Sequence, residues 1–425
     1  MSSKFLIEGL AGARTLQGTI PVRGAKNAVL KSMAAALLFD GPVALTNVPQ
    51  IEDVARMSEL LVGLGARVEH ASGSCTIDPR SASSTDIDER LARTLRASIV
   101  LSGPVLARFG KVSFPHPGGD VIGPRPIDMF IEGFQKLGAE VGFSQERYSV
   151  SAPKGLKGAE IFFRFVSVTA TETIMMAAVL AQGTTVLKNV AMEPEIVELA
   201  EFLNRCGAKI TGAGTPTITV VGGALLRSEG ATLQTMPDRI EAGTFVLLGA
   251  LAASELTITD CNPTHCEMLI ELLRDSGVEI TTTASSITVR GKTPLKPLQI
   301  RTHEYPGFAT DLQPPMVVYL TQAEGESTMF ETIWGGRLNY TQDLIQMGAD
   351  ITLWNPQQIS IKGPTPLHAR NLQSPDIRAG LAFLMAAAVA DGTSQIDHVY
   401  HIDRGYEAIE ERLAKVGLNI KREIA

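Results

Sequence analysis

The sequence has few cysteines, no excess of basic charge and no long uninterrupted apolar run. Four cysteines in 425 residues do not make a disulfide framework, so we expect a reduced, cytoplasmic setting. The formal net charge is -7, so a general basic field that would hold nucleic acid or an anionic membrane surface is not expected. Because no apolar segment reaches the length of a membrane span and no secretion signal is recognisable, we expect neither membrane insertion nor secretion.

Groups of metal ligands are also scarce. Cys261 and Cys266 flank His265, but this loose group lacks the second pair of ligands that a structural zinc site needs. We interpret the group as packing, with metal binding as the alternative, and expect neither a metal nor a cofactor. What the chain does have is length and apolar content, because 44% of its residues are hydrophobic, enough for more than one buried core.

A glycine that follows an amphipathic helix recurs along the chain, each time before a short alternating strand. These glycines lie roughly 70 residues apart, at Gly65, Gly138, Gly207, Gly277, Gly348 and Gly417. Glycine suits the position because the left-handed conformation that ends a helix costs it little. Strongly apolar helices such as TETIMMAAVLAQ and GLAFLMAAAVA also recur, and they must be buried in the centre of a domain. The sequence therefore predicts six α/β repeats.

Six repeats can form one open solenoid or two closed groups of three. We favour two groups, because three such units already make a domain of ordinary size. The polar stretch at residues 227–243 lies midway through the repeats, as a linker would. We therefore predict a first domain at residues 22–235, which includes a loop at about 115–128, and a second domain formed by residues 1–21 and 236–425.

Two segments before apolar helices carry groups suited to anions. In Gly24-Ala25-Lys26-Asn27, a helix start supplies free backbone N–H groups, a positive dipole end and an ammonium group. The alternative is a solvated Lys26 beside an ordinary cap, which the segment taken alone favours. Val166-Ser167-Val168 offers hydroxyl and N–H groups to a diphosphate, and its alternative is a plain helix cap with an acid of the capping-box kind.

The segment from Pro115 to Asp128 is rich in glycine and proline, so it cannot be a regular helix or a central strand. It carries Asp120, Arg125 and Asp128. Long irregular loops in compact domains are usually lids or binding loops, and glycines beside an acid allow such a loop to swing into a closed site. A plain surface connector needs no arginine between two prolines, so the segment indicates a functional loop.

Isolated acids and arginines form a further set at expected helix or strand edges. Each one alone is more often part of a surface ion pair. Together, arginines from both halves of the chain favour a cleft for a multiply charged anion, because guanidinium groups match the geometry of phosphate and carboxylate. The set consists of Arg96, Asp238, Arg239, Glu241, Asp311, Arg337, Asp376, Arg378 and Arg404.

These residues lie in motifs that run through the whole chain: GAKNA, LRASI, PGGDVIGPRPID, SVTATET, EPEIVELA, PDRIEAGTF, TDLQ, DIRAG and YHIDRGYE. In this order and spacing, the motifs resemble the UDP-N-acetylglucosamine 1-carboxyvinyltransferase family, which catalyses the first committed step of peptidoglycan synthesis. The resemblance implies a two-domain inverted α/β barrel with three repeats per domain. It also implies a cytoplasmic enzyme with phosphoenolpyruvate and UDP-N-acetylglucosamine as its partners, and with no cofactor, nucleic acid, membrane or obligate protein partner.

The resemblance implies roles for residues of these motifs. Catalytic roles fall to Asp120, Asp311, Lys26 and Arg404, with Asp311 taking the hydroxyl proton and Asp120 giving a proton to the methylene of phosphoenolpyruvate. Lys26, Arg125 and Arg404 are expected to hold phosphoenolpyruvate, in a pocket completed by Asp376, Arg378 and Arg337. Contacts to the sugar and the nucleotide are expected from Asn27, Asp311, Arg96, Arg125, Pro126, Ile127, Asp128, Met129, Val166, Ser167, Val168 and Ile333.

Three positions depart from the family pattern. Many members carry a cysteine at the position of Asp120, and that thiol is the group alkylated by fosfomycin, so an active enzyme that fosfomycin does not inactivate covalently is expected. Phe165 stands where some members have a basic residue, and Gly335-Gly336 where an acid and an amide are common, which predicts weaker nucleotide binding. Two alternatives remain: a shikimate 3-phosphate enolpyruvyl transferase, disfavoured by the loop motifs, and a non-catalytic nucleotide-sugar binding paralogue, disfavoured by the retained catalytic set.

Overall fold

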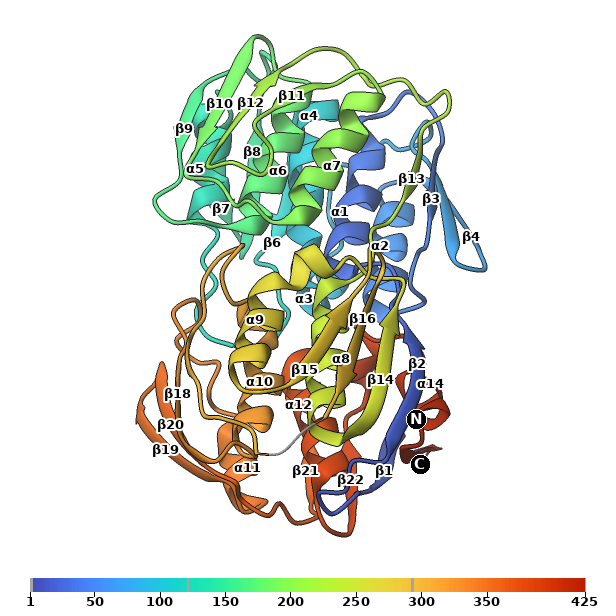
Figure 1. Cartoon of the computed structure of the whole chain (residues 1–425). Coiled ribbons are helices and arrows are strands. Elements are labelled where there is room, and N and C mark those ends of the chain that lie inside the picture. Colours follow the sequence, from blue (N-terminus) through green and yellow to red (C-terminus); the bar gives the residue numbers. More distant parts are fainter. Residues whose placement is uncertain (1–2, 121, 292–293, 425) are drawn as a thin grey trace. The chain divides into compact units, whose positions relative to one another are not determined.

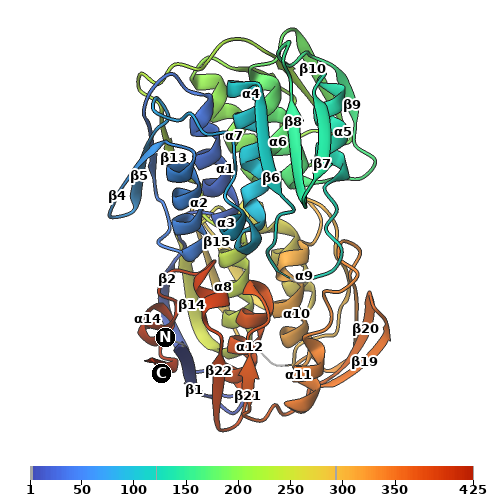
Figure 2. The ribbon, with the colours of Figure 1, turned by 180° about the vertical axis from the view of Figure 1, so that it is seen from behind.

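The computed structural model describes residues 3–120, 122–291 and 294–424. Contacts within the chain divide it into two units. Unit 1 contains Met1–Arg23, Asp120–Pro124 and Pro237–Ala425, and unit 2 contains Gly24–Gly119 and Arg125–Met236. Within the described residues, each unit has three small sheets around a group of apolar helices (Figure 1 and Figure 2).

The inner helices of unit 2 are buried on nearly every face. In α6 (Val168–Val179), all residues from Ala170 to Val179 are buried, since the helix is mostly apolar and has no continuous polar stripe. The other inner elements are α1 (Lys26–Ala35), η1 (Ala36–Leu38), η2 (Arg96–Leu101) and α4 (Ser102–Phe109). The outer helices keep one exposed face, and they are α2 (Glu52–Gly63), α3 (Glu89–Thr94), α5 (Asp128–Lys136) and α7 (Pro194–Arg205).

Each sheet of unit 2 presents alternate side chains to the core, as the two-residue period of a strand requires. In the first sheet, Val43 and Leu45 face the same buried side as Cys75 and Ile77 of the antiparallel neighbour. Its order is β13 (Thr232–Gln234), β3 (Val43–Thr46), β5 (Ser74–Asp78), β4 (Arg67–Ala71). The others are β6 (Lys111–Pro115), β8 (Arg147–Ser151), β7 (Glu140–Ser144), and β11 (Lys209–Thr211), β12 (Thr217–Val221), β10 (Thr184–Lys188), β9 (Glu160–Phe162).

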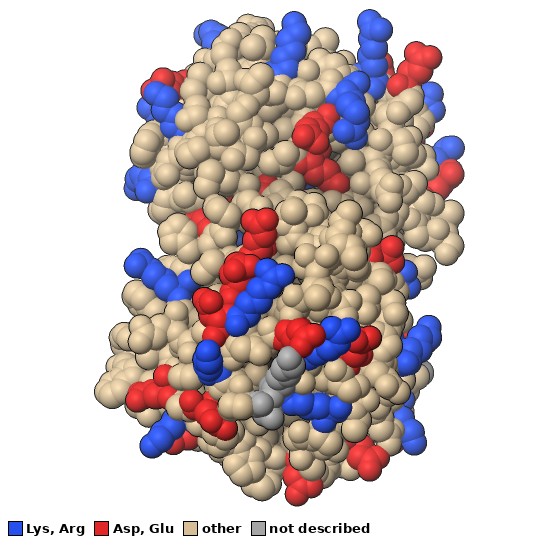
Figure 3. Space-filling view, viewed as in Figure 1, with Lys and Arg blue, Asp and Glu red and all other residues tan. Residues whose placement is uncertain are grey.

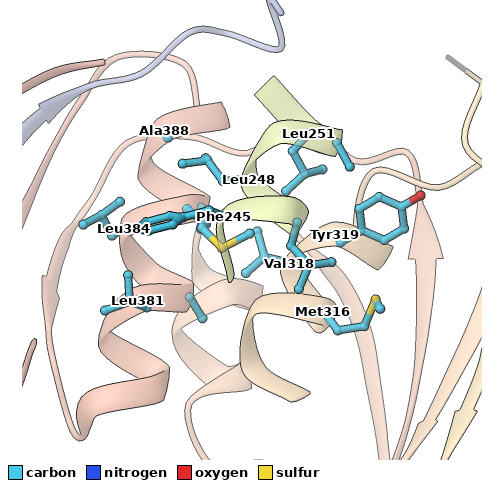
Figure 4. Close-up of a cluster of buried hydrophobic side chains, with 14 of the residues drawn as sticks. Phe245, Leu248, Leu251, Met316, Val318, Tyr319, Leu381, Leu384 and Ala388 are labelled. Atoms are coloured by element: carbon cyan, nitrogen blue, oxygen red, sulfur yellow. The ribbon is translucent and has the colours of Figure 1, made fainter. Parts of the chain in front are cut away.

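Unit 1 has the same kind of apolar centre. Its inner helices are α8 (Arg239–Ala252), α10 (Gln313–Leu320) and α12 (Ile377–Val389). Phe245, Val318 and Leu384, one from each helix, point toward one another in Figure 4 and are essentially inaccessible to water. The remaining helical segments are η3 (Pro263–Cys266), α9 (Glu267–Asp275), η4 (Thr310–Leu312), α11 (Thr341–Gln346), α13 (Tyr400–Asp403) and α14 (Ile409–Lys415).

One sheet of unit 1 joins the two ends of the described chain. The strand β1 (Ser3–Glu8) pairs on one side with β22 (Thr393–Asp397) and on the other with β23 (Asn419–Ile424), and β21 (Asn371–Gln373) lies at the edge. The second sheet has the order β15 (Glu279–Thr282), β16 (Ser286–Arg290), β14 (Ala253–Thr259), β2 (Leu16–Pro21). The third is β17 (Gln299–Arg301), β18 (Gly325–Phe330), β20 (Gln358–Gly363), β19 (Asp350–Asn355).

A helix, a glycine and a strand follow one another at all the glycines singled out from the sequence. Gly65 lies between α2 and β4 with φ +93°, and Gly348 lies between α11 and β19 with φ +112°. All have positive φ, the left-handed conformation expected of them, at Gly65, Gly138, Gly207, Gly277, Gly348 and Gly417.

The stretch at residues 227–243 contains the division between the two units, at Met236 and Pro237, and it also has regular structure. Its middle forms the edge strand β13, which pairs in parallel with β3, and its end forms the first turn of α8. Leu233 is buried in this pairing, and Asp238 caps α8 by accepting from the N–H groups of Ile240 and Glu241 at 2.8 and 3.0 Å. Its charged and polar composition therefore reflects an edge strand and a helix cap, which composition alone does not separate from a linker.

The described surface mixes charges of both signs. On the face shown in Figure 3, Lys and Arg side chains alternate with Asp and Glu, and no broad patch of one sign is visible among the described residues. This agrees with the absence of a general basic field in the composition. Among the helices of the described residues, none is both long enough and apolar enough to cross a membrane.

Candidate functional site

In unit 1 one carboxylate is held between two arginines. Asp311 lies in η4, directly before the buried helix α10. Arg337 Nη2 donates to its Oδ1 at 3.0 Å, and Arg378 donates to its Oδ2 through Nη2 at 2.9 Å and Nε at 3.1 Å. Both guanidinium groups are buried while the carboxylate is 28% exposed, so the negative charge is stabilised at a position that solvent can reach.

The start of α12 fixes Arg378. Asp376 caps this helix, and its Oδ1 accepts from the backbone N–H groups of Arg378 and Ala379 at 2.8 and 3.0 Å. The Arg378 side chain then donates through Nη1 to the hydroxyl of Tyr406 at 2.9 Å. Burial raises the pKa of Tyr406, so its hydroxyl stays protonated and neutral. Asp376 thus acts first as a helix cap, and through it as a support for Arg378.

A second ion pair in unit 1 involves the irregular loop. Arg404, which follows α13, donates through Nη1 to Oδ1 of Asp120 at 2.5 Å. The side chains are 6% and 18% exposed, so the pair is largely shielded from water. His401 is nearby, and its pKa is lowered by burial and then by the charge of Arg404. The pair brings together two residues for which the family motifs imply catalytic roles.

The same loop approaches the two glycines that depart from the family pattern. A Cβ atom on Gly336 would lie 3.2 Å from the backbone nitrogen of Gly123, and one on Gly123 would lie 3.1 Å from the nitrogen of Gly336. Gly123 also has φ +120°, which side chains rarely adopt. The backbones of the two segments can therefore approach this closely because Gly123 and Gly336, which face each other, have no side chains.

Lys26 forms a buried ion pair in unit 2. Its ammonium group lies 2.8 Å from Oδ2 of Asp53 in α2, and Asp53 is 2% exposed. Lys26 is the first residue of α1, whose start has no side-chain cap, and Asn27 follows it. The sequence therefore placed Lys26 and Asn27 correctly at a helix start, and the partner Asp53 comes from the neighbouring helix.

Arg96 holds the two ends of the irregular loop. It donates through Nη1 to the carbonyl of Pro117 at 3.0 Å and through Nη2 to the carbonyl of Arg125 at 2.5 Å. Burial and the charge of Arg125 lower the pKa of Arg96 to about 10, so the side chain is still a cation at neutral pH. Gly118 is required here, because a Cβ atom would lie 1.7 Å from the carbonyl oxygen of Arg93.

The other expected nucleotide contacts divide into buried and accessible positions. Ile127 and Met129 have side chains in the core of unit 2, each 4% exposed, whereas Pro126 is exposed. Asp128 begins α5 and receives a 2.5 Å contact from Arg164. The segment Val166-Ser167-Val168 is half-buried at the start of α6, where Ser167 Oγ accepts from Ala170 N at 3.3 Å, as in the capping alternative.

A lysine and a glutamate are buried together inside unit 2. Lys31 Nζ donates to the carbonyl of Asn27 at 2.6 Å and lies 3.3 Å from Oε2 of Glu172, which is fully buried. Burial raises the pKa of Glu172 to about 7, and the nearby charges of Glu195 and Glu193 act in the same direction, while Lys31 opposes them. The inside of unit 2 therefore carries more acid than base.

Some residues around Asp311 were not expected from the sequence. Glu331, directly after β18, is fully buried and accepts from Thr310 Oγ1 at 2.9 Å, and Thr310 Oγ1 accepts from Arg337 Nη1 at 3.0 Å. The only signal in the sequence was an acid at the end of the alternating strand GESTMF. Ile333, which the family pattern did indicate, donates its N–H to Glu331 Oε1 at 2.8 Å.

Two of the cysteines are buried in unit 1. Cys261 and Cys266 belong to the hydrophobic core of unit 1, and burial raises the pKa of Cys261 to about 11. Within the described residues, no group of three or more His, Cys, Asp or Glu side chains is arranged to hold a metal ion.

Known proteins match this chain along almost its whole length. The family model described as EPSP synthase (3-phosphoshikimate 1-carboxyvinyltransferase) matches residues 10–413. A UDP-N-acetylglucosamine 1-carboxyvinyltransferase from Solibacter usitatus is 43% identical over 420 residues, which is 99% of each chain. The chain belongs to the enolpyruvyl (1-carboxyvinyl) transferase family. A Caulobacter vibrioides relative of the same name is 40% identical over 418 residues, 97% of each chain.

Solved structures support the fold of this enolpyruvyl transferase. The enolpyruvyl transferase NikO from Streptomyces tendae aligns with a TM-score of 0.88 at 23% identity and covers 100% of this chain and 99% of its own. EPSP synthase from Acinetobacter baumannii aligns with a TM-score of 0.74 at 19% identity and covers 100% of both chains. The transferase is therefore a mixed α/β protein with the fold of enolpyruvyl transferases.

Proposed function

We propose that this enzyme transfers the enolpyruvyl group of phosphoenolpyruvate to the 3-hydroxyl of UDP-N-acetylglucosamine, with release of phosphate, as the first committed step of peptidoglycan synthesis. The observation that carries the proposal is the Asp311 carboxylate held between Arg337 and Arg378, in a chain that matches enzymes of this name over nearly its full length. An ionised carboxylate beside buried cations suits proton removal from a hydroxyl next to an anionic substrate.

The reaction we propose is addition followed by elimination. Asp311 accepts the proton of the sugar hydroxyl while the hydroxyl oxygen forms a bond to C2 of phosphoenolpyruvate. The electrons of the C2–C3 double bond then take a proton at the methylene carbon. In the elimination, Asp120, ionised after giving its proton, takes a methyl proton, the C–H electrons form the double bond again, and the C2–O bond breaks so that phosphate leaves with that electron pair. Arg337, Arg378 and Arg404 balance the charge of the anionic substrate, since guanidinium groups pair well with carboxylate and phosphate.

Asp120 is proposed as the donor of the proton to the methylene. In the structure the Asp120 carboxylate forms an ion pair with Arg404. The family resemblance implies that Arg404 binds phosphoenolpyruvate. Binding of that anion to Arg404 therefore competes with the ion pair. Loss of the arginine partner removes the charge that stabilises ionised Asp120, and so makes protonation of Asp120 easier.

The residues of unit 2 are proposed to serve the same reaction. Lys26 and Arg125 bind phosphoenolpyruvate, Asn27 meets the sugar, and the nucleotide contacts come from the loop and the start of α6. The supporting observations are the uncapped start of α1 at Lys26 and the half-buried position of Ser167 at the start of α6. Arg96, which holds the loop ends, contacts the nucleotide in this proposal and also sets the loop that carries Asp120.

The finer organisation of the fold is also a proposal. We propose an inverted α/β barrel with three repeats in each of two domains, at residues 22–235 and at residues 1–21 with 236–425. The helix, glycine and strand at each of the spaced glycines support it, as do the three sheets in each unit. We further propose that the enzyme works in the cytoplasm without a cofactor or obligate protein partner.

The direct test is phosphate release from phosphoenolpyruvate with two acceptors offered separately. We expect release with UDP-N-acetylglucosamine and not with shikimate 3-phosphate. The reverse preference would assign the chain to the shikimate branch of the family, and no release with either acceptor would indicate a binding paralogue. Asp120→Ala and Asp120→Cys provide the matched pair, because the first has no group to donate a proton and the second has a thiol.

A further inference from the structure

Glu331 is a buried acid placed between the two segments that carry Asp311 and Arg337. It follows β18 directly and its side chain is fully buried. Oε1 accepts from the backbone N–H groups of Ile333 and Trp334 at 2.8 and 3.1 Å, and from Thr302 Oγ1 at 3.1 Å. A buried carboxylate needs such donors, because an unsatisfied charge is costly inside a protein.

The second oxygen of Glu331 leads to the reacting group. Oε2 accepts the hydroxyl proton of Thr310 at 2.9 Å. With its proton committed to Glu331, Thr310 Oγ1 presents a lone pair to Nη1 of Arg337 at 3.0 Å, and Nη2 of the same guanidinium donates to Asp311. The chain of contacts therefore runs from Glu331 through Thr310 and Arg337 to Asp311, and Thr310 is the neighbour of Asp311 in sequence.

Glu331 also fixes the segment from which Arg337 comes. The N–H groups of Ile333 and Trp334 turn toward the carboxylate and start the turn that leads to Arg337. A second hydrogen bond fixes the start of this segment, since the hydroxyl of Thr332 donates to the carbonyl of Thr302 at 2.6 Å. One carboxylate thus joins the segment before α10 to the segment after β18.

We propose that Glu331 is a positioning residue for the transfer reaction and acts through Thr310 on Arg337 and Asp311. This inference rests on the proposed function, since it concerns the placement of the group that accepts the hydroxyl proton. Glu331 directs the Thr310 hydroxyl so that it accepts from Arg337, and Arg337 holds Asp311 in one orientation. A displacement of about 1 Å in a reacting group can lower a rate by about 100-fold.

An amide in place of the carboxylate cannot satisfy both sides. In Glu331→Gln, one orientation of the amide places its nitrogen toward Thr310. The amide N–H and the threonine O–H are then two donors that face each other without an acceptor. If the amide is turned over, its nitrogen faces the N–H groups of Ile333 and Trp334. Either orientation breaks contacts to one of the two segments. Thr310→Val removes the hydroxyl at nearly constant volume, while Thr310→Ser keeps it.

The experiment measures kcat, the KM of each substrate and thermal stability for Thr310→Val, Thr310→Ser and Glu331→Gln. We expect kcat to fall by about 10- to 100-fold in Thr310→Val with each KM changed less than about threefold, because positioning of the base affects the transition state more than substrate binding. Thr310→Ser should stay within about twofold of the wild type. Thr365→Val is the matched control, since Thr365 is a half-buried threonine of unit 1 that donates to a backbone carbonyl.

Coupling between the two positions separates this role from a general loss of structure. If Glu331 acts through Thr310, the double variant Thr310→Val/Glu331→Gln should have nearly the kcat of Glu331→Gln alone, rather than the product of the two losses. Titration with UDP-N-acetylglucosamine should still show one site per chain, because a misfolded fraction would lower that number.

Three results would overturn the inference in recognisable ways. An active wild type with Thr310→Val equal to it would exclude the relay and leave the proposed function intact. Failure of Thr310→Ser to restore activity, or multiplicative losses in the double variant, would mean that the hydroxyl contact is not the route. A wild type that releases no phosphate with UDP-N-acetylglucosamine would remove the proposed function, and this inference with it.

Discussion

The two units treat their charged residues differently. In unit 1, arginines from separate segments converge on carboxylates: Arg337 and Arg378 on Asp311, and Arg404 on Asp120. In unit 2, Lys26 is paired with the buried Asp53 and Arg96 donates to backbone carbonyls. Unit 1 therefore concentrates positive charge around partly accessible carboxylates, whereas unit 2 uses its cations to hold helix starts and loop ends.

The buried acids sharpen this difference. In unit 1 the buried Glu241 meets Arg412 through two contacts at 2.6 and 3.0 Å; burial raises the pKa of Glu241, and Arg412 opposes that rise. In unit 2 the buried Glu172 has Lys31 at 3.3 Å, but the negative charges of Glu195 and Glu193 act with burial to raise its pKa. We infer that the proposed chemistry centres on the carboxylates of unit 1, and that Glu172 and Glu198 of unit 2, whose pKa is raised to about 7 by burial, make stability depend on pH near neutrality.

The largest expected effect concerns Asp311. Asp311→Asn removes the proton acceptor and the shared partner of two buried arginines, so we expect kcat to fall by about 1,000-fold, within the range for loss of a general base. Phosphate release with both substrates present is the measurement. Asp350→Asn, an exposed position in β19, is the control and should leave the rate unchanged. A loss below about tenfold in Asp311→Asn would mean that another group takes the proton.

A smaller effect on activity is expected at Lys26 in unit 2. Lys26→Met should lower kcat/KM for phosphoenolpyruvate by about 100-fold, since a charged hydrogen bond to an anion contributes about 1.5–3 kcal/mol. The comparison variant is Lys31→Met, in the same helix. Both variants should lower thermal stability, because each removes the lysine beside a buried acid, Asp53 or Glu172, but only Lys26→Met should lower kcat/KM. Steady-state kinetics and thermal unfolding of both variants measure the contrast. If Lys31→Met lost activity and kept full stability, the division between the two lysines would be wrong.

The pH dependence of stability should change in Glu172→Gln. The pKa of Glu172 is about 7 in the folded protein and 4.5 in a free glutamate, so the folded state binds the proton more tightly. Protonation thus contributes stability that is full below about pH 4.5 and is lost as the pH rises through 7, a change of about 3 kcal/mol. Urea unfolding between pH 5 and pH 8 should show this decline in the wild type and a smaller one in Glu172→Gln.

Glu198 and Glu201 in α7 serve as comparisons for that measurement. Burial also raises the pKa of Glu198 to about 7, so Glu198→Gln should likewise remove part of the decline in stability between pH 5 and pH 8. Glu201 is exposed, and Glu201→Gln should leave the slope of stability against pH unchanged. An unaltered slope in Glu172→Gln would show that Glu172 stays ionised throughout this range.

The smallest effect on rate is expected at Asp120. Asp120→Cys keeps a group that can give a proton, so we expect kcat within about tenfold of the wild type, although the ion pair with Arg404 is lost. Fosfomycin should alkylate this variant and not the wild type, because a carboxylate at this position cannot act as a thiolate nucleophile. Intact mass measurement after incubation detects the adduct, and an adduct on the wild type would contradict the expectation.

The repeated local features of the fold were accessible from the sequence. The helix ends at Gly65 and Gly348 follow from the low cost of positive φ in glycine, and the burial of α12 follows from its apolar composition. The segment at 227–243 contains the division between the two units, at Met236 and Pro237, but its polar composition did not reveal the edge strand β13, in which only Leu233 is buried. Strand pairing such as that of β1 with β22 and β23 joins residues about 400 positions apart, and such partners leave little trace in a single sequence.

The candidate site was accessible only where residues departed from the repeats. Asp311, Arg337, Arg378 and Arg404 stood out as isolated charged residues at expected helix or strand edges, yet the sequence could not say which arginine meets which acid. Glu331 was missed because one acid after a strand resembles any exposed strand end. Its role becomes visible only when its complete burial and its contacts are known.

By itself, the sequence determined the spacing of the glycine-ended helices, the apolar centres of the units and, through its motifs, membership of the enolpyruvyl transferase family. These features depend on local conformation, on residue type or on direct similarity, all of which are written along the chain. Only the tertiary structure decided that Arg337 and Arg378 share Asp311, that Arg404 holds Asp120, and that Glu331 is connected to Asp311 through Thr310 and Arg337. Charge pairing acts over a few ångströms in space, and distance along the chain does not reveal it.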